Sequence, residues 1–273
     1  MIAIHFCSIA GGIALAMLIG AGFCHLAPKL GSAGPKFSEM LCSAPGLDIV
    51  ITYFTILPLV VGSHFGGWLG LLAAVVGQTV GMEAWEKLHE MAHRDATRGP
   101  RIVKVINSKV GRVRNFFATW ITAVVTPIFW LIRVAEVAVY PWLTLLVRFP
   151  AYNDAEWVNV SRQKFQGLVG HDLIWCLYCD WMTGVWSLAT EMLRNVESFW
   201  CPIRFASGKK CENCAIDFPD INGGWVDAAG TMADVTATLD RMYTSEGDHP
   251  WFGHRVRITV KGKELDLVGS TGR

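Results

Sequence analysis

The chain has 273 residues, of which 52% are hydrophobic and 17% are charged. This composition is too apolar for an ordinary soluble domain, and it indicates an integral membrane protein. The formal net charge of +1 gives no bias toward nucleic acid, and no nucleic-acid partner is expected. The predicted fold class is mainly α: an integral membrane helical protein with a Cys-rich loop and a small α+β soluble domain at its C-terminus.

Residues 1–82 are predicted to form an N-terminal membrane anchor and a second apolar segment. The run 3–24 is long enough to cross a bilayer and lacks the basic start and the cleavage site of a signal peptide. The block 49–82 is too long for one untilted crossing and too short for two full crossings with a loop. Pro58 and the stretch 63–67 therefore favour a re-entrant hairpin or one long kinked helix.

Small residues recur every four positions in both apolar segments. Such faces let helix backbones approach closely, and they predict docking to other membrane protein subunits or to helices of this chain. The first face consists of Ser8, Gly12, Ala16, Gly20 and Cys24, and the second consists of Ala73, Gly77 and Gly81.

Residues 83–114 are predicted to form a basic, helical, cytoplasmic loop. Eight Lys and Arg side chains accumulate there beside the membrane segments, which by the positive-inside rule places the loop in the cytoplasm. The basic stretch 101–114 carries two interpretations: contact with anionic lipid head groups, or a topology signal alone.

The same region contains the motif H-E-x-x-H, formed by His89, Glu90 and His93. On a helix, two histidines one turn apart can bind zinc together, while the glutamate acts as general base on metal-bound water. A membrane zinc metallopeptidase is therefore one alternative. Charged flanks such as Lys87 and Arg94 favour a solvated helix paired at helical spacing instead.

Residues 115–200 are predicted to form membrane or interfacial helices. Arg133 and Glu136 interrupt the third apolar block, and their three-residue spacing allows them to pair on one helix face. A kinked span or two helices meeting at the interface fits this block. From 167 to 200 a polar stripe at helical spacing predicts one long, mostly buried helix.

Five cysteines indicate a metal site, and three of them gather in the predicted Cys loop 201–220. Thiolates in two C-x-x-C pairs and a Cys-Pro suit zinc, with an iron–sulfur cluster as a further possibility. The compact set is Cys201, Cys211 and Cys214 with a fourth ligand from elsewhere. The other two, Cys176 and Cys179, are either further ligands or small helix residues facing a neighbour.

The last region, 221–273, is predicted to be a small soluble α+β domain in the cytoplasm. Residues 232–243 have helical character, while 255–260 and 264–268 suggest strands joined by a turn.

The function predicted from these patterns is that of a non-catalytic, membrane-embedded subunit that anchors or assembles a larger membrane protein complex. Its cysteine site would hold zinc. The alternatives are the zinc metallopeptidase with Glu90 as its catalytic base, and an iron–sulfur electron-transfer subunit.

Overall fold

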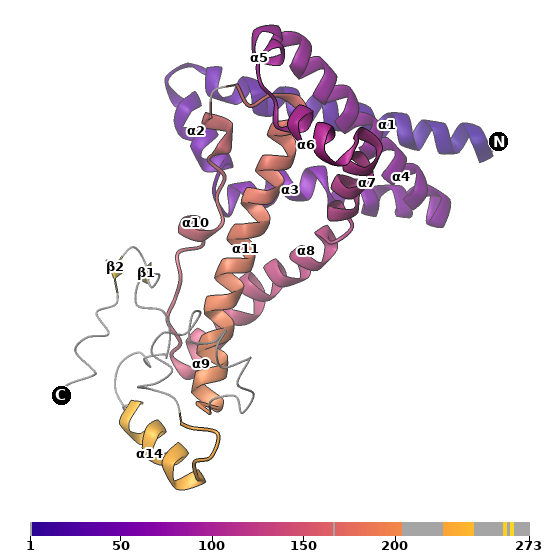
Figure 1. Ribbon diagram of the computed structural model, residues 1–273. Helices are drawn as coiled ribbons and strands as arrows, with labels where there is room; N and C mark the ends of the chain where they lie inside the picture. The colour runs from indigo at the N-terminus through magenta and orange to yellow at the C-terminus, as the bar shows by residue number, and fades with distance from the viewer. Residues whose placement is uncertain (1, 166, 204–225, 243–258, 261–262, 265–273) are drawn as a thin grey trace. The chain divides into compact units, whose positions relative to one another are not determined.

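The computed structural model is mainly helical (Figure 1), as the sequence predicts. It describes residues 2–165, 167–203, 226–242, 259–260 and 263–264. The chain divides into two compact units, which are treated separately below. The first comprises Met1–Phe129 with Val158–Gly184, and the second comprises Trp130–Trp157 with Val185–Arg273.

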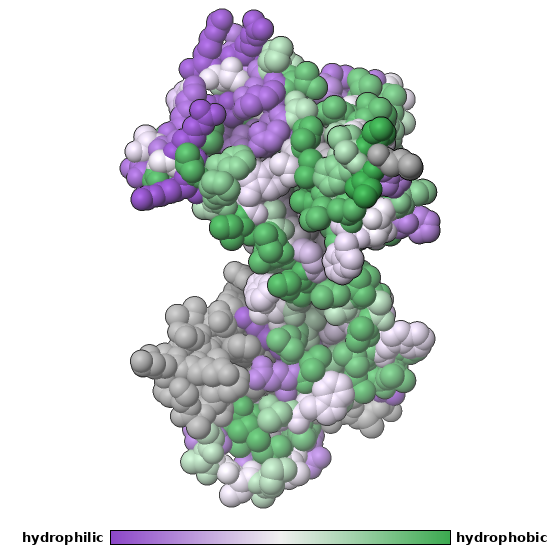
Figure 2. Space-filling model, turned by 90° about the vertical axis from the view of Figure 1, so that its right-hand side faces the viewer, coloured by the Kyte–Doolittle hydropathy of each residue, from purple (hydrophilic) through white to green (hydrophobic). Residues whose placement is uncertain are grey.

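Three helical segments are long and apolar enough to cross a membrane: Ile2–Lys29, Ile56–Ala92 and Arg112–Val147. Large apolar side chains lie exposed along all three. Hydrophobic residues, in green, cover wide areas of the face drawn in Figure 2. A soluble protein rarely exposes so much apolar surface without a partner. The structure therefore fits an integral membrane protein.

The first unit begins with α1 (Ile2–Leu26), and two short 3-10 turns follow it. Its further elements before the third apolar segment are α2 (Gly34–Leu41), α3 (Gly46–Phe54), α4 (Ile56–Ala92), α5 (Arg94–Arg98) and α6 (Ile102–Val110). A cis peptide bond joins Ala44 to Pro45 just before α3.

The second apolar segment is a helical hairpin that turns at Gly67. This glycine has φ 56° and ψ −138°, a backbone conformation open only to glycine. The Gln78 side-chain amide donates hydrogen bonds to the carbonyls of Phe54 and Thr55, at 2.9 and 2.8 Å. Residues so far apart in sequence meet only if the chain reverses, so of the two predicted forms the structure contains the hairpin.

Both arms of this hairpin are longer than the sequence predicts. The arm 46–66, interrupted at Thr55, extends over about 30 Å, and the arm 68–92 over about 37 Å, at the helical rise of about 1.5 Å per residue. Each arm is at least as long as the hydrocarbon core of a bilayer is thick, about 30 Å. The helices begin at Gly46 and continue to Ala92, so they extend beyond the predicted block 49–82 at both ends.

α1 packs along the hairpin through small residues, and α1 and α4 run side by side in Figure 1. A Cβ atom on Gly77 would lie 2.5 Å from the carbonyl oxygen of Ala10, and one on Gly81 would lie 3.2 Å from that of Ala14. The predicted face on α4 is thus a real packing face, and its partner belongs to this chain. On α1 the residues in contact with these glycines are Ala10, Ile13, Ala14 and Met17, none of which belongs to the predicted face.

The third apolar segment is a broken helix, as the sequence predicts. It consists of α7 (Arg112–Ala123), α8 (Thr126–Val134), a π-helical turn at Ala135–Val139 and α9 (Tyr140–Val147). The predicted ion pair is confirmed: Arg133 Nη1 lies 2.8 Å from Glu136 Oε2, and both side chains are buried. Arg133 also reaches Asp154 in α10 (Asp154–Trp157), at 2.9 Å.

α11 (Gly170–Trp200) confirms the predicted long helix. Its part within the second unit packs through aromatic and polar contacts. The Asn195 amide donates to the hydroxyls of Tyr140 and Tyr152 at 2.9 and 2.7 Å, and Phe199 stacks edge-on against Phe149. Burial of the Tyr152 hydroxyl raises the pKa of this side chain.

The prediction of an α+β C-terminal domain is not supported. Its helix is present as α14 (Met232–Met242). The described residues of 221–273 otherwise contain only β1 (Thr259–Val260) and β2 (Lys263–Glu264), an antiparallel pair. Two residues on each side are too few to bury a core against the helix. Most of the predicted Cys loop 201–220 lies outside the described residues.

Candidate functional site

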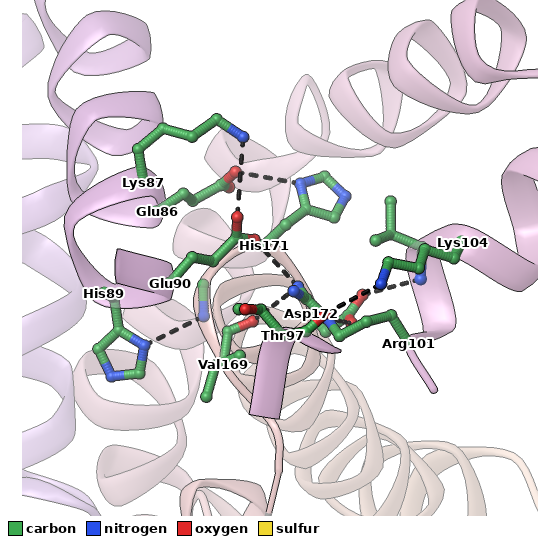
Figure 3. A network of polar contacts seen from close by, with 12 residues as sticks. Glu86, Lys87, His89, Glu90, Thr97, Arg101, Lys104, Val169, His171 and Asp172 are labelled. Atoms are coloured by element: carbon green, nitrogen blue, oxygen red, sulfur yellow. Dashed lines mark hydrogen bonds and ion pairs between the residues drawn. The ribbon is translucent and has the colours of Figure 1, made fainter. Parts of the chain in front are cut away.

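The most developed polar site of the first unit lies where α4 ends and where α6 and α11 begin (Figure 3). Five side chains form it, here called the Arg101 cluster: Glu86, Glu90, Arg101, His171 and Asp172. They come from three segments of the chain, and the contact between Glu86 and His171 joins residues 85 positions apart. The cluster contains the glutamate of the H-E-x-x-H motif.

Arg101 is the centre of this cluster, with its side chain only 4% exposed. Its Nε donates to Asp172 Oδ2 at 2.7 Å, and its Nη2 donates to Glu90 Oε1 at 3.0 Å and to the carbonyl of Val169 at 3.1 Å. Burial opposes the charged form, but the hydrogen bonds to Asp172 and Glu90 outweigh it and raise the pKa of Arg101. The guanidinium is therefore fully charged and committed to internal contacts.

Asp172 also caps α6. Arg101 occupies the N-cap position of that helix, and its side chain makes no capping hydrogen bond. Instead Asp172 Oδ1 accepts the backbone N–H of Val103 at 3.0 Å. A carboxylate from another helix thus satisfies one of the free donors at this helix start and also suits its dipole.

Glu86 and His171 form the second half of the cluster. His171 Nδ1 lies 3.2 Å from Glu86 Oε2, and the glutamate side chain is 2% exposed. The hydrogen bond with Glu86 raises the pKa of His171, in spite of the opposing effect of burial. Lys87 lies nearby at 3.9 Å from Glu90 and is largely exposed. The Glu86–His171 pair joins the first turn of α11 to the last turns of α4.

The histidines of the motif are held in a way that does not suit zinc. His89 Nδ1 accepts the backbone N–H of Gly170 at 3.1 Å. A neutral imidazole has one lone-pair nitrogen, so Nε2 of His89 carries the hydrogen and cannot act as a ligand. His93 Nδ1 lies 3.0 Å from the carbonyl of His89 and must be the donor there, which leaves a lone pair only on its Nε2.

Aromatic stacking accounts for the rest of the surroundings of His89. Its ring stacks on Trp85 with 4.6 Å between centroids and on His93 with 4.3 Å. His25 of α1 meets both histidines edge-on, at 6.3 and 6.4 Å. In the part of the chain that the structure describes, no group of three His, Cys, Asp or Glu side chains is arranged to hold a metal ion.

The predicted solvated helix around the motif is present only in part: Lys87 is exposed and pairs with Glu90 at helical spacing, but other contacts differ. Glu86 is buried, and Glu90 reaches Arg101 instead of pairing only with neighbours on its own helix. The charges at this helix end are neutralised by groups from α11 and from the start of α6. Sequence spacing reveals only partners within one helix, and these are not the main partners here.

The predicted cysteine ligands are placed only in part. Cys176 and Cys179 lie on α11, and Cys201 follows its end; all three are free thiols. Burial raises the pKa of the Cys176 thiol, which disfavours the thiolate that a metal requires. Cys211 and Cys214 lie outside the described residues, so the zinc and iron–sulfur predictions remain predictions.

Sequence reasoning missed Arg101 and Asp172 as the centre of the site. The available signals were an arginine just before a helix and an aspartate in the first turn of another helix. Neither signal shows that the two side chains meet, because 71 positions separate them.

Chemically, the cluster can hold helix ends together at one edge of the first unit. The buried guanidinium of Arg101 binds the carboxylates of Glu90 and Asp172. His171 binds a third carboxylate, that of Glu86. Comparison with protein-family models, with curated proteins and with solved structures finds no match to this chain.

Proposed function

We propose that this protein is a non-catalytic, membrane-embedded subunit that anchors or assembles a larger membrane protein complex. The observation that carries the proposal is the part of the small-residue face on α1 that none of the described residues covers. The face divides into a covered and an open part. Tyr53 covers Gly20 and donates a hydrogen bond to the Ala16 carbonyl, whereas a Cβ on Gly12 would meet nothing within 4 Å.

The open part borders an apolar groove of about 270 Å³ between α1 and the first arm of the hairpin. Ser8, Gly12 and Ala16 form one wall, while Leu57, Val61 and Phe65 contribute to the other. In a bilayer, helices associate through small residues that allow close backbone approach. A groove with this lining is suited to a helix of another subunit.

The contacts of the motif residues support a non-catalytic role. Glu90 is bound to Arg101, and the lone pair of His89 is occupied by Gly170. The zinc metallopeptidase is therefore the weaker alternative. It requires His89 to exchange its hydrogen bond with Gly170 for a metal and Glu90 to leave its ion pair.

Two further parts of the proposal concern topology and metal. We place the basic segment 83–114 in the cytoplasm, because Lys and Arg accumulate there beside the membrane segments. We assign zinc to Cys201, Cys211 and Cys214 because thiolates at this spacing suit it. An iron–sulfur cluster is the alternative occupant of those thiolates.

The test compares Gly12→Leu with Gly11→Leu in the full chain, purified in mild detergent. A Cβ at either glycine meets nothing within 4 Å, but only Gly12 lines the groove. We expect wild type and Gly11→Leu to have a protein mass above the 30.1 kDa of one chain by size exclusion with light scattering. Gly12→Leu should lose this excess mass with unchanged helicity.

Two outcomes overturn the proposal. One is a wild-type mass equal to that of a single chain, and the other is a Gly12→Leu complex of wild-type size. Glu90→Gln tests the alternative function. Loss of a proteolytic activity with unchanged assembly would reverse the ranking in favour of the peptidase.

A further inference from the structure

α6 is a short amphipathic helix that exposes apolar side chains. Ile102, Val105, Ile106 and Val110 are between 38% and 53% exposed, and they recur at the spacing of one helix face. Such a stripe on a surface helix is expected to be covered by something apolar.

The contacts on the other side of α6 keep this stripe turned outward. Asp172 accepts the Val103 N–H, and Arg101 is bound at the helix start. At the helix end, the Asn115 side chain donates to Asn107 Oδ1 at 2.9 Å. These contacts fix the rotation of α6, so the stripe cannot turn inward to be buried by the chain itself.

A sharp bend separates α6 from the third apolar segment. Gly111 has φ 90°, a left-handed backbone conformation that favours glycine. The candidate membrane span begins directly after it, at Arg112. The bend therefore lies at the end of a membrane-crossing segment, where the hydrocarbon core gives way to the head groups.

The charges around the bend all have the same sign. Lys104, Lys109, Arg112 and Arg114 are exposed, and the sequence contains no Asp or Glu between Asp95 and Glu136. In the described part of the chain none of the four cations forms an ion pair, and Lys104 donates only to the Thr97 carbonyl. Arg101 differs from them, because its charge is already neutralised by Asp172 and Glu90.

We propose that α6 lies in the plane of the membrane surface and binds anionic phospholipid head groups through Lys104, Lys109, Arg112 and Arg114. Its apolar stripe enters the boundary between head groups and acyl chains, and the cations face the phosphates. Arg101, although part of the same basic stretch, does not contact lipid. This inference rests on the membrane-embedded part of the proposed function, and it does not depend on the groove at Gly12.

The experiment measures lipid retention by native mass spectrometry of the full chain. The protein is purified in detergent with equal amounts of phosphatidylglycerol and phosphatidylcholine. Wild type should retain phosphatidylglycerol preferentially, and the preference should fall as salt is added. A variant with Gln at all four cations should lose it, since each charge near the surface contributes about fivefold in affinity.

The matched control removes four cations elsewhere, with Gln at Lys29, Lys36, Arg94 and Arg98. It changes the net charge equally but should keep the preference for phosphatidylglycerol. A second pair separates the stripe from the charges: Ile106→Asp should weaken retention more than Ser108→Asp, because only Ile106 belongs to the stripe.

Three outcomes overturn the inference: no preference in the wild type, equal loss in both quadruple variants, or retained preference when Lys104, Lys109, Arg112 and Arg114 are replaced. If the last is accompanied by loss of a bound protein, α6 docks a partner protein instead of lipid. The assembly state of Gly12→Leu is measured separately. The groove proposal can therefore fail while phosphatidylglycerol retention stays intact, and the reverse can also occur.

Discussion

Asp172 makes two contacts that the first unit requires at the same time. One of its oxygens neutralises the buried Arg101, and the other caps α6 at Val103. When one partner of a buried ion pair is removed, the other charge remains buried without full compensation. Asp172 should therefore contribute more to stability than the exposed charges around it.

We predict that Asp172→Ala lowers the free energy of unfolding by about 3–5 kcal/mol. Chemical denaturation in detergent, followed by circular dichroism, measures the effect. The control is Asp180→Ala, in which a more exposed carboxylate loses its contacts with Arg162 and with the Ser161 N–H. A loss of the same size in both variants would show that the central position of Asp172 is not what matters.

His171 predicts a pH dependence with a definite sign. The hydrogen bond with Glu86 raises its pKa, and Glu83 and Asp172 also face the ring. A base whose pKa is raised by folding contributes stability below its ordinary pKa and loses it as the pH rises through the raised value. The melting temperature should therefore fall as the pH rises from the ordinary histidine pKa of about 6.5 through the raised pKa of His171.

Replacing His171 by Gln should flatten this fall and remove about 1 kcal/mol at the acid end. His64→Gln serves as the control, because His64 is exposed and lies at the hairpin turn. Thermal scans at several pH values measure both variants. A slope that survives in His171→Gln would assign the titration to another group.

For single residues, the sequence reveals the members of the motif but not the groups that they contact. The spacing of His89, Glu90 and His93 follows from the sequence, because a helix places them on known faces. The Gly170 N–H that occupies His89 comes from a segment 81 positions away. No local pattern indicates such a contact, and for this reason a zinc motif and a structural cluster look alike in the sequence.

The packing of α1 on α4 gives a prediction at the scale of elements. A Cβ on Gly77 would lie 2.5 Å from the Ala10 carbonyl oxygen and 3.0 Å from the Ile13 Cβ. Neither atom is the end of a flexible side chain, so the two helices have to move apart. Gly77→Ala should lower stability by about 1–3 kcal/mol.

Gly12→Ala is the matched control for this prediction, since it is also a helical glycine and has open space around it. Alanine favours helix over glycine, so this variant should be neutral or slightly stabilising in thermal unfolding. Equal melting temperatures for the two variants would contradict the close approach at Gly77.

The helices and their packing faces could be predicted well where the length of an apolar block and the spacing of small residues determine them. Block length and the breakers near Gly67 predict a turn in the second apolar segment, and the structure forms a hairpin there. Four-residue spacing predicts the face at Gly77 and Gly81. The contact residues on α1 could not be predicted, because small residues occupy several of its faces and only the partner decides which face is used.

For the whole molecule, composition is the strongest predictor. Apolar content and segment length predict a helical membrane protein, and three segments of the structure meet those requirements. The α+β domain at the C-terminus is predicted only from short segments of alternating hydrophobicity, and segments of that length determine a fold weakly. In the described part of 221–273, a two-residue strand pair and one helix are too little to form the core that such a domain needs.

The metal content of the intact chain depends on residues that lie far apart in the sequence. Zinc should be bound by wild type and absent from the double variant Cys211→Ser with Cys214→Ser. The double variant His89→Ala with His93→Ala should keep it, because the hydrogen bond from Gly170 leaves His89 without a lone pair for a metal. Elemental mass spectrometry of the detergent-purified proteins, with absorption spectra, measures zinc and iron together.

The pattern of metal loss shows which residues bind the metal. Zinc lost only from the cysteine variant places it at thiolates and leaves the motif to its structural role. Zinc lost only from the histidine variant means that His89 exchanges its hydrogen bond for a metal, and the peptidase then becomes the better proposal. Iron with thiolate absorption would indicate a cluster and electron transfer instead. If no variant contains metal, the cysteines are ordinary thiols, and the assembly function rests on the groove alone.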